Sequence, residues 1–355
     1  MVEHRVEDVL NIHPETAMFL DEGEIRYYGP TAGLYRAVDY HRIKLPAPLI
    51  LERAVKDPVP EPVTRQLEAA KAGIPNQTLV RFEGVRFGYE ENQTVLAGIN
   101  LEIRRGDIIA VLGPNGAGKT TLVKHAIGLL KPKAGRVLVD GRDTHQISVA
   151  EVAHTLGYVF QSPSHMLFAE TVRAELAFGP TNLKHPPEEI EKDVREAIRI
   201  VHLEGFEENP PLALSFGQQK RVSIAAILAM RSRILVMDEP TAGQDYKNYM
   251  EFMDAILKLP GFEAVLFITH DIDLAVIYAN RVILVNHGQV VRDGTPEEVL
   301  KDLAYLEENR LVPTSLLKTN LELYAHTRSF QRAEDLAHLG VLQNRSDRYQ
   351  NSTLQ

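Results

Sequence analysis

The most informative stretch of the sequence is a glycine-rich octapeptide that could hold phosphate groups. Residues Gly113–Thr120 fit the pattern G-x-x-x-x-G-K-[ST] at every fixed position. Glycines let a backbone wrap around an anion with its amide groups turned inward. In this pattern the Lys119 ammonium reaches the β- and γ-phosphates of a nucleoside triphosphate, and the Thr120 hydroxyl ligates Mg²⁺. An incidental glycine-rich turn is the alternative, and the flanking strand and helix patterns argue against it.

A second group of residues could complete a phosphate-transfer site. Ile234–Met237 is an apolar run typical of a buried strand, and two carboxylates, Asp238 and Glu239, follow it. Asp238 is placed to hold Mg²⁺, and Glu239 is a candidate general base for an attacking water. A charged strand end in solvent is the alternative for the pair taken alone. The phosphate loop in the same chain favours the catalytic interpretation.

Alternating strand and helix patterns would position these residues. Ile108–Leu112 is wholly apolar, as expected for a strand buried on both faces, and Lys119–Leu130 has the pattern of a helix. Further strands are predicted at Leu79–Phe87, Val95–Ile103, Thr155–Phe160, Ile234–Asp238 and Ala264–Thr269, and further helices at Pro187–His202, Gly217–Met230, Asp245–Leu259 and Ile272–Ala279. Such alternation predicts an α/β fold with a mainly parallel sheet.

Composition excludes several classes of function. The 355 residues include no cysteine, which excludes disulfides, thiolate metal sites and cysteine nucleophiles and fits a reducing cytoplasm. No apolar run approaches the ~18 residues of a membrane-spanning helix, and the N-terminus lacks a signal-peptide pattern. The formal net charge of −9 argues against a broad nucleic-acid-binding face, so no nucleic acid partner is expected.

The order of these motifs resembles that of the ABC ATPase family of P-loop NTPases over residues 78–300. Leu214–Gln219 is similar to the family signature, and Ala242–Asp245 to the segment called the D-loop. Single residues match further stations of the family: Gln161 the Q-loop glutamine, His270 the switch histidine, and Tyr89 the aromatic that stacks on adenine. Each match is weak alone, but their common order is specific.

The resemblance implies an ATPase that uses ATP and Mg²⁺. It implies a mainly parallel core sheet with an antiparallel β subdomain, a helical subdomain and a helical C-terminal extension. Glu239, His270 and Gln161 would be catalytic, and Thr120, Gln161 and Asp238 would hold the metal. Nucleotide contacts would come from Tyr89, Gly113, Pro114, Asn115, Gly116, Ala117, Gly118, Lys119, Thr120, Thr121, Ser215, Gly217, Gln218 and Asp245.

The family logic also implies a second ABC ATPase domain, in a homodimer or a heterodimer. Two domains pair head to tail, so that Ser215 and the Gly217 amide contact the γ-phosphate bound by the partner. ATP then holds the closed state together, and hydrolysis releases it. One residue departs from the signature: Phe216 replaces the first glycine of the usual pair. Because Ser215 and Gly217 are kept, we expect a working site, with weakened hydrolysis as the alternative.

Within the family, the closest resemblance is to the ATPases of energy-coupling-factor transporters, which import vitamins or metal ions. It rests on Phe160–Val172 and Ala177–Leu183, the aromatic in the signature, Pro240–Gly243 and the helical C-terminal region. Expected partners are an integral membrane coupling subunit and a substrate-binding membrane subunit, at the cytoplasmic face of the membrane. Met166, Leu167 and Phe168 would line the groove for a coupling helix, or alternatively pack in the core.

An internal repeat marks the N-terminal region. Val2–Val9 resembles Ile268–Ala275, and Met18–Ile25 resembles Ile283–Val290. We therefore expect residues 1–53 to be the C-terminal remnant of a preceding ABC ATPase domain, lacking a phosphate loop, and either poorly ordered or packed onto the main domain. The remaining predicted divisions are a proline-rich linker at 54–77 with a short helix near Thr64–Ala72, the complete domain at 78–300, a helical extension at 301–342 and a disordered tail at 343–355.

Two other classes of function stay open at this point. A soluble ABC protein of ribosomes or DNA is the first, although such proteins usually carry two whole domains and a charged helical linker, and this chain has a proline-rich linker and an acidic total charge. A nucleotide-gated scaffold that closes without turnover is the second, and the carboxylate of Glu239 argues against it.

Overall fold

The computed structural model describes residues 7, 14–21, 23–57, 63, 65, 67, 76–91, 93–242 and 246–339. These residues divide between two compact units. The large unit comprises the segments 64–242 and 255–311, and the small unit comprises the segments 1–63, 243–254 and 312–355. One helix, α10 (Tyr246–Lys258), crosses the division.

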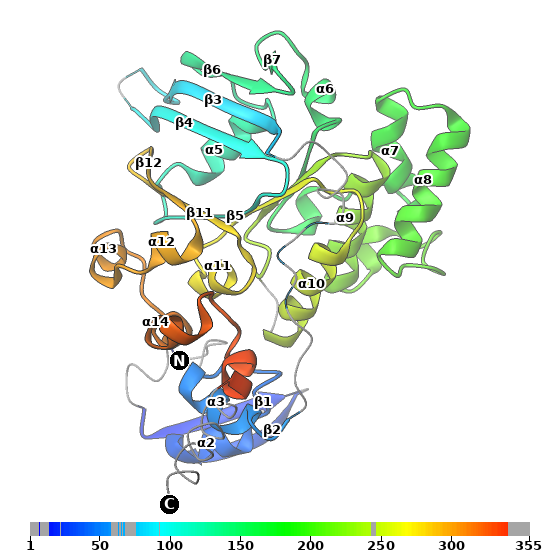
Figure 1. Ribbon diagram of the computed structural model, residues 1–355. Coiled ribbons are helices and arrows are strands. Elements are labelled where there is room, and N and C mark those ends of the chain that lie inside the picture. Colours follow the sequence, from blue (N-terminus) through cyan, green and yellow to red (C-terminus); the bar gives the residue numbers. More distant parts are fainter. Residues whose placement is uncertain are drawn as a thin grey trace, which may run out of the picture. The chain divides into compact units, whose positions relative to one another are not determined.

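A six-stranded sheet forms the centre of the large unit, in the order β12-β11-β5-β10-β9-β8 (Figure 1). Its strands are β5 (Ile108–Leu112), β8 (Leu156–Val159), β9 (Ile234–Asp238), β10 (Ala264–Ile268), β11 (Arg281–Asn286) and β12 (Gln289–Gly294). β8, β9, β10, β5 and β11 are mutually parallel, whereas β12 is antiparallel to β11. The carboxyl ends of the parallel strands therefore meet at one edge of the sheet, where such folds place their sites.

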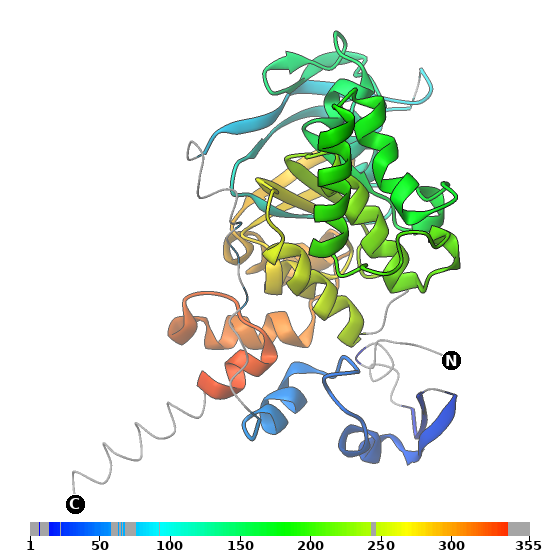
Figure 2. The ribbon, with the colours of Figure 1, turned by 90° about the vertical axis from the view of Figure 1, so that its right-hand side faces the viewer.

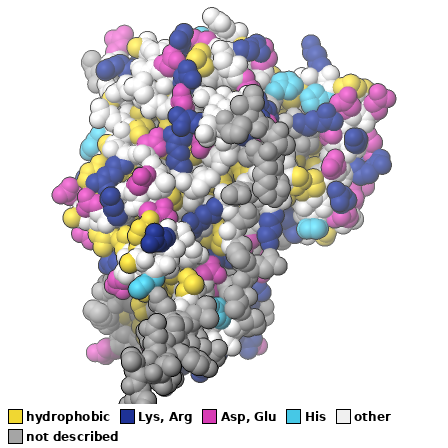
Figure 3. All heavy atoms as spheres, viewed as in Figure 1, with side chains coloured by type: hydrophobic (Ala, Val, Ile, Leu, Met, Phe, Trp, Pro, Cys, Tyr) yellow, Lys and Arg dark blue, Asp and Glu magenta, His cyan; other side chains and the backbone are white. Residues whose placement is uncertain are grey.

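A second, antiparallel sheet has the order β4-β3-β6-β7. Its strands are β3 (Thr78–Phe87), β4 (Leu96–Arg104), β6 (Ala134–Val139) and β7 (Arg142–Asp143). Apolar side chains of β3, β4 and β6 share one buried core with the central sheet and α5 (Lys119–Ala126). On the opposite face, Glu102 of β4 pairs with Arg81 of the neighbouring strand β3 and with Arg104 of its own strand. Figure 3 shows basic and acidic side chains interspersed in the same way over the visible surface.

Helices complete the large unit. They are α5, α6 (Val149–Ala153), α7 (Val172–Asn182), α8 (Pro187–Ile200), α9 (Phe216–Ala229), α11 (Ile272–Tyr278), α12 (Pro296–Leu300) and α13 (Leu303–Glu308). α7, α8 and α9 pack side by side as a helical subdomain (Figure 2). α5 ends at Ala126, four residues before the predicted end, because Gly128 adopts a φ of +73° that stops a helix.

The small unit combines the two ends of the chain. It contains β1 (Thr16–Asp21), β2 (Glu24–Pro30), α2 (Thr31–Ala37), α3 (Ala47–Ala54) and α14 (Ser315–Thr327), and residues 333–339 are also helical. α14 begins after Pro313, where the sequence predicted a break, and α3 packs against it. The Ala47 N–H donates to the Ser315 hydroxyl over 2.9 Å, so the N-terminal segment has partners in the C-terminal extension.

The two hairpins of the chain have the same strand pairing. β1–β2 and β11–β12 are offset by 265 residues, so that Met18 faces Tyr28 as Ile283 faces Asp293. The register shifts after Phe19 in the first hairpin and after its counterpart Leu284 in the second. A helix follows each hairpin, α2 in the first case and α12 in the second. The repeat read from the sequence is therefore also a repeat of local structure.

Several predicted elements differ in extent or lie outside the described residues. β5 and β9 have the predicted bounds, whereas β6, β7, α6 and α7 were not predicted. Within the predicted linker, Arg65 donates to the Val276 and Ile277 carbonyls of α11, and Leu67 is buried, so this part is held on the large unit. The short helix at Thr64–Ala72 and the tail 343–355 lie outside the described residues. Among those residues, no helix combines the length and apolar character needed to cross a bilayer.

Candidate nucleotide site

The phosphate loop connects the buried strand β5 to α5, as its pattern requires. Gly113, Gly116 and Gly118 have φ values of +147°, +80° and +104°, which L-residues with side chains rarely adopt. A Cβ on Gly113 would lie 2.0 Å from the Val285 carbonyl oxygen of β11. No heavy atom lies within 4 Å of a Cβ built on Gly116, so the loop is open on that side. The glycines are thus required by the fold at one end of the loop and leave space for an anion further along.

Lys119, the first residue of α5, is 8% exposed. Its Nζ donates to the carbonyl oxygens of Gly113 and Pro114, over 2.7 and 3.0 Å. Burial lowers the pKa of the Lys119 ammonium, and the nearby charges of Glu239 and Asp238 oppose that shift. A desolvated ammonium inside a loop of positive-φ glycines fits a phosphate group, because a bound anion would stabilise the charged ammonium in place of the water that burial removes.

Asp238 ends β9 at the same edge of the sheet. Its Oδ2 accepts a hydrogen bond of 2.7 Å from the hydroxyl of Tyr158 on the neighbouring strand β8. Burial raises the pKa of the Asp238 carboxyl, and the hydrogen bond from Tyr158 and the charge of Lys119 act against that rise. The phenol therefore orients one oxygen of this carboxylate and favours its charged form, which is the form that ligates a metal ion.

Glu239 follows directly, in a left-handed conformation with φ of +44°. Its N–H donates to the Ile268 carbonyl over 2.9 Å, which fixes this turn to the end of β10. One carboxylate oxygen lies 3.0 Å from Nδ1 of His270, and the other accepts from the Thr269 hydroxyl over 3.4 Å. The Glu239 side chain is 17% exposed and that of His270 is 62% exposed. A carboxylate held by two neighbours, with one of them facing solvent, can take a proton from a water molecule.

Other predicted residues surround this edge. The Tyr89 hydroxyl lies 3.3 Å from that of Thr121 on α5, and its ring, 56% exposed, meets the Phe87 ring edge to face. Gln161 is exposed just after β8, and Thr120 is exposed at the start of α5. Asp245 lies outside the described residues, as do Gly243 and Gln244.

The predicted signature residues begin α9, which belongs to the helical subdomain. Ser215 is the N-cap: its hydroxyl accepts from the Gln218 N–H, and the Gln218 side chain accepts from the Ser215 N–H over 2.9 Å. Gly217 is exposed, and no heavy atom lies within 4 Å of a Cβ built on it. These residues therefore present a helix N-terminus to solvent and leave space beside the backbone. Within the part of the chain that the structure describes, no hydrogen bond or ion pair joins these signature residues to the phosphate loop.

Three residues that contact this machinery were not found by sequence reasoning. Tyr158 and Thr269 bond the two carboxylates, and Lys220 of α9 reaches the turn after Glu239. Tyr158 lies on the short strand β8, three residues before Gln161. The alternation of apolar and polar residues in so short a strand does not indicate that Tyr158 bonds Asp238. Lys220 could have been noticed as a lysine one turn after Phe216, before an apolar helix interior.

The sequence left open whether the residues after Gln161 line a groove for a coupling helix or pack in the core, and the structure places them differently. Leu167 is 3% exposed and belongs to the core, whereas Phe168 is 62% exposed. The Phe168 ring meets the Phe178 ring of α7 edge to face, with centroids 4.7 Å apart, and Phe178 is also exposed. The exposed part is thus an aromatic pair between the Q-loop region and the helical subdomain.

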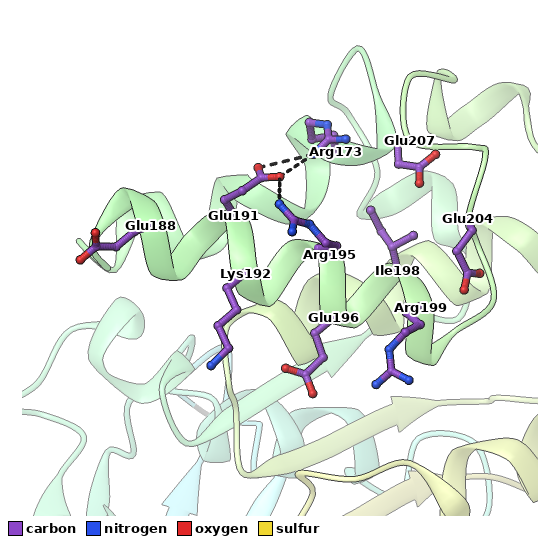
Figure 4. Close-up of a pocket in the computed structure, with 10 residues that line it drawn as sticks. All are labelled: Arg173, Glu188, Glu191, Lys192, Arg195, Glu196, Ile198, Arg199, Glu204 and Glu207. Atoms are coloured by element: carbon purple, nitrogen blue, oxygen red, sulfur yellow. Dashed lines mark hydrogen bonds and ion pairs between the residues drawn. The ribbon is translucent and has the colours of Figure 1, made fainter.

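A cavity in the helical subdomain is separate from this site (Figure 4). Its lining residues are Arg173, Glu188, Glu191, Lys192, Arg195, Glu196, Ile198, Arg199, Glu204 and Glu207. Glu191 accepts from both Arg173 and Arg195, as the dashed lines in the figure show. None of the predicted nucleotide or metal residues lines it, and its alternating charges are typical of a solvated helix face.

Comparison with known proteins agrees with the geometry. The profile of the ABC transporter family matches residues 96–242. The energy-coupling factor transporter ATP-binding protein EcfA of Methanocaldococcus jannaschii is 43% identical over 236 residues, which are 66% of this chain and 85% of that protein. A putative ABC transporter ATP-binding protein of Bacillus cereus is 34% identical over 340 residues, which are 90% of this chain but 60% of that protein.

A solved structure is similar as well. CbiO1 from Clostridium perfringens, part of the ABC transporter complex CbiONQ, superposes with a TM-score of 0.59 at 34% identity, covering 70% of this chain and 97% of that one. A parallel sheet with a phosphate loop, a carboxylate pair and a signature helix defines an ABC-type ATPase, and the predicted fold class is confirmed. The chain belongs to the family of energy-coupling factor transporter ATP-binding proteins. It is an ATP-binding protein and an ATPase, as the sequence predicted.

Proposed function

We propose that the chain powers uptake of a vitamin or metal ion as the ATPase subunit of an energy-coupling-factor transporter, at the cytoplasmic face of the membrane. The observation that carries the proposal is the convergence at one sheet edge: the desolvated Lys119 ammonium has the charges of Asp238 and Glu239 close by, and His270 bonds Glu239. Parallel strands with their carboxyl ends together are what bring these groups into one site.

Each residue has a role that follows from its position. Lys119 and the loop amides bind the β- and γ-phosphates, and Tyr89 stacks on the adenine. The Thr120 hydroxyl, the Asp238 carboxylate and the Gln161 side chain hold Mg²⁺, and hydroxyl, carboxylate and amide oxygens are the ligands that this ion takes in proteins. When bound, Mg²⁺ neutralises charge on the phosphates. Glu239 accepts the proton of the attacking water, with His270 orienting the carboxylate at 3.0 Å.

The site is completed by a second ABC ATPase domain. Ser215, Gly217 and Gln218 begin α9 on an exposed turn with space beside Gly217, so a phosphate bound by a partner domain can approach the helix N-terminus. Apart from residues 243–245, which lie outside the described residues, every contributing element belongs to the large unit. A partner in the same orientation would offer its own signature to Lys119's loop, giving a head-to-tail dimer with two shared sites.

We propose further that residues 1–53 are the end of a preceding ABC ATPase domain. The support is the common register of β1–β2 and β11–β12, and the packing of α3 on α14, which follow the hairpins of their respective copies. The Bacillus cereus relative, which extends well beyond the aligned 90% of this chain, has room for such a domain.

The exposed aromatic pair Phe168 and Phe178 is the surface that we assign to the membrane coupling subunit. A coupling helix needs an apolar groove whose position responds to the nucleotide, and this pair lies between the segment after Gln161 and α7. The backbone at Phe168 is tied to α7, because the Glu175 carboxylate of α7 accepts from the Phe168 and Ala169 N–H groups over 2.8 Å. Movement of the helical subdomain would therefore carry the pair with it.

The test is reconstitution of the chain with a membrane coupling subunit and a substrate-binding subunit in proteoliposomes. ATP-dependent uptake is expected, and Phe168→Asp should abolish uptake and binding to the coupling subunit while leaving the ATPase rate of the isolated chain unchanged. Leu129→Asp is the matched control, since Leu129 is also exposed (52%) but lies after α5. Fractionation of the wild-type chain with ribosomes rather than membranes would reject the transport function.

A further inference from the structure

Lys220 is a buried lysine near the start of the signature helix. It lies one turn after Phe216, on α9, and is 2% exposed. Lysine is seldom buried to this extent unless its ammonium group has partners, because desolvation of the charge is costly. Burial lowers the pKa of Lys220 to about 8. The buried ammonium of Lys220 is therefore expected to have specific hydrogen-bond partners.

The ammonium of Lys220 holds the turn that follows the proposed general base. Its Nζ donates to the Pro240 carbonyl oxygen over 2.5 Å and to the Ala242 carbonyl oxygen over 3.3 Å. The same turn is closed by the Ala242 N–H, which donates to the Glu239 carbonyl over 3.0 Å. Lys220 therefore contacts the backbone of the turn at two points, within three residues of Glu239.

The other side of the ammonium faces the unusual aromatic of the signature. Nζ of Lys220 lies 5.1 Å from the centroid of the Phe216 ring, within the range of a cation–π contact. Phe216 stands where the family usually has glycine, directly between Ser215 and Gly217. The ring and the ammonium thus connect the signature turn to the turn of Glu239 inside one subunit.

We propose that Lys220 is a positioning residue for ATP hydrolysis. Its ammonium holds the Glu239–Ala242 turn against the signature helix, and the Phe216 ring packs over that ammonium. The inference rests on the proposed function, in which Glu239 is the base and the signature contacts the nucleotide bound by the partner. When a partner's phosphate docks on Ser215 and Gly217, a displacement of the α9 N-terminus passes through Lys220 to the base of the other site. The two ATP sites of a dimer are then linked through each subunit.

The decisive variants separate the charge of Lys220 from its volume. Lys220→Met keeps the length and apolar stem but cannot donate to the Pro240 and Ala242 carbonyls, whereas Lys220→Arg keeps the donors. For Lys220→Met we expect kcat for ATP to fall at least tenfold, KM and the equilibrium affinity for ADP to stay within about twofold, and the Hill coefficient for ATP to fall towards one. Lys220→Arg should restore kcat to within a few-fold of the wild type.

The role of Phe216 has its own matched pair. Phe216→Tyr keeps a ring over the ammonium, whereas Phe216→Leu keeps apolar volume without the ring. Phe216→Leu should lower the Hill coefficient and kcat in the same direction as Lys220→Met, by a smaller factor, and Phe216→Tyr should keep both within about twofold.

A merely structural role would give a different result. If Lys220 only packs the helix, Lys220→Met will lower thermal stability or leave activity intact, and kcat per folded molecule will stay within twofold of the wild type, which overturns the inference. Glu239→Gln is measured in parallel: if that variant still hydrolyses ATP at the wild-type rate, the assignment of the base fails instead. An inactive Glu239→Gln together with a fully active Lys220→Met rejects the positioning role alone.

Discussion

The two hairpins of this chain share local structure but differ in burial. Val282–Val285 of β11 are 0% exposed, whereas the counterparts Met18 and Leu20 of β1 are 53% and 55% exposed. The strand pairing, the register shift and the positive-φ glycine of the turn are nevertheless the same in both. The pairing within a hairpin is therefore fixed by the alternation of its residues and by its turn, whereas the burial of its side chains depends on what packs against it.

The difference comes from the neighbouring strand. β11 pairs on its other edge with β5, the strand that leads into the phosphate loop, and α12 and α11 pack against β11 and β5. Among the described residues, β1 and β2 form a sheet of two strands. The apolar side chains of β1 therefore have no further strand beside them among the described residues, which explains their exposure.

The largest expected effect is on catalysis, because the proposed base Glu239 belongs to the large unit, which also contains β11 and β12. Glu239→Gln keeps the size of the side chain but removes the base, so we expect kcat to fall about 100-fold or more while ATP binding persists. Phosphate release and equilibrium binding of a fluorescent ATP analogue measure the two quantities. His270→Ala should lower kcat as well, and His4→Ala, at the repeat position of the first copy, should not. A drop for His4→Ala would mean that both copies contribute to turnover.

Matched truncations of the two hairpins test the difference in burial directly. Ile283→Ala removes a fully buried side chain and should destabilise the large unit by about 2–5 kcal/mol. Met18→Ala, at the equivalent position of β1, should change stability by less than about 0.5 kcal/mol. The relevant quantity is the midpoint of the unfolding transition that ADP shifts upward, because ligand binding marks the large unit. Equal destabilisation by both variants would contradict the exposure of β1.

The turn glycines give a smaller and subtler contrast. Gly23 and Gly288 both have positive φ, +80° and +71°, so alanine costs about 1 kcal/mol at either position from backbone strain. At Gly288 a Cβ would also lie 2.2 Å from the Val95 carbonyl oxygen, whereas no heavy atom lies within 4 Å of one at Gly23. We therefore expect Gly288→Ala to cost about 2 kcal/mol more than Gly23→Ala. Hydrogen exchange of the amides in each hairpin reports both costs in one experiment, and equal losses of protection would show that strain alone acts.

The position of the candidate catalytic edge was predictable in outline from the sequence, because each of its motifs is contiguous. Gly113–Thr120 lies between an apolar run and a helix pattern, and Asp238 and Glu239 end another apolar run, so local signals suffice to place them. β6 and α7 were missed, because the first half of β6 is exposed and includes a glycine, and because α7 contains Pro180 and has little amphipathic pattern. Propensity alone does not predict such elements, since their contacts with distant residues decide them.

Contacts between side chains of different elements could not be predicted from the sequence either, because they depend on tertiary packing. The bond from Tyr158 to Asp238 joins residues 80 positions apart, and that from Lys220 to Pro240 joins a helix to a strand-end turn. Leu167 was left open between groove and core, and only tertiary packing decides that it is core. The residues that we propose for the chemistry can thus be predicted from motifs, whereas the residues that hold them in place cannot.

The smallest effect that we predict concerns one such supporting contact, which joins the neighbouring parallel strands β8 and β9. Tyr158→Phe removes only the hydroxyl that donates to Asp238 over 2.7 Å, and the ring keeps its place beside Phe160. A hydrogen bond to a charged group contributes about 1.5–3 kcal/mol, but much of that loss is recovered when water or Mg²⁺ takes the vacated carboxylate oxygen. We expect the Mg²⁺ concentration for half-maximal ATPase activity to rise two- to fivefold, with about the same kcat at saturating Mg²⁺. Titration of ATPase activity with Mg²⁺ at fixed ATP measures the shift, and Tyr305→Phe, far along the chain on α13, is the control that should leave it unchanged. A lower requirement for Mg²⁺ in Tyr158→Phe would show that the phenol competes with the metal ion instead of orienting its ligand.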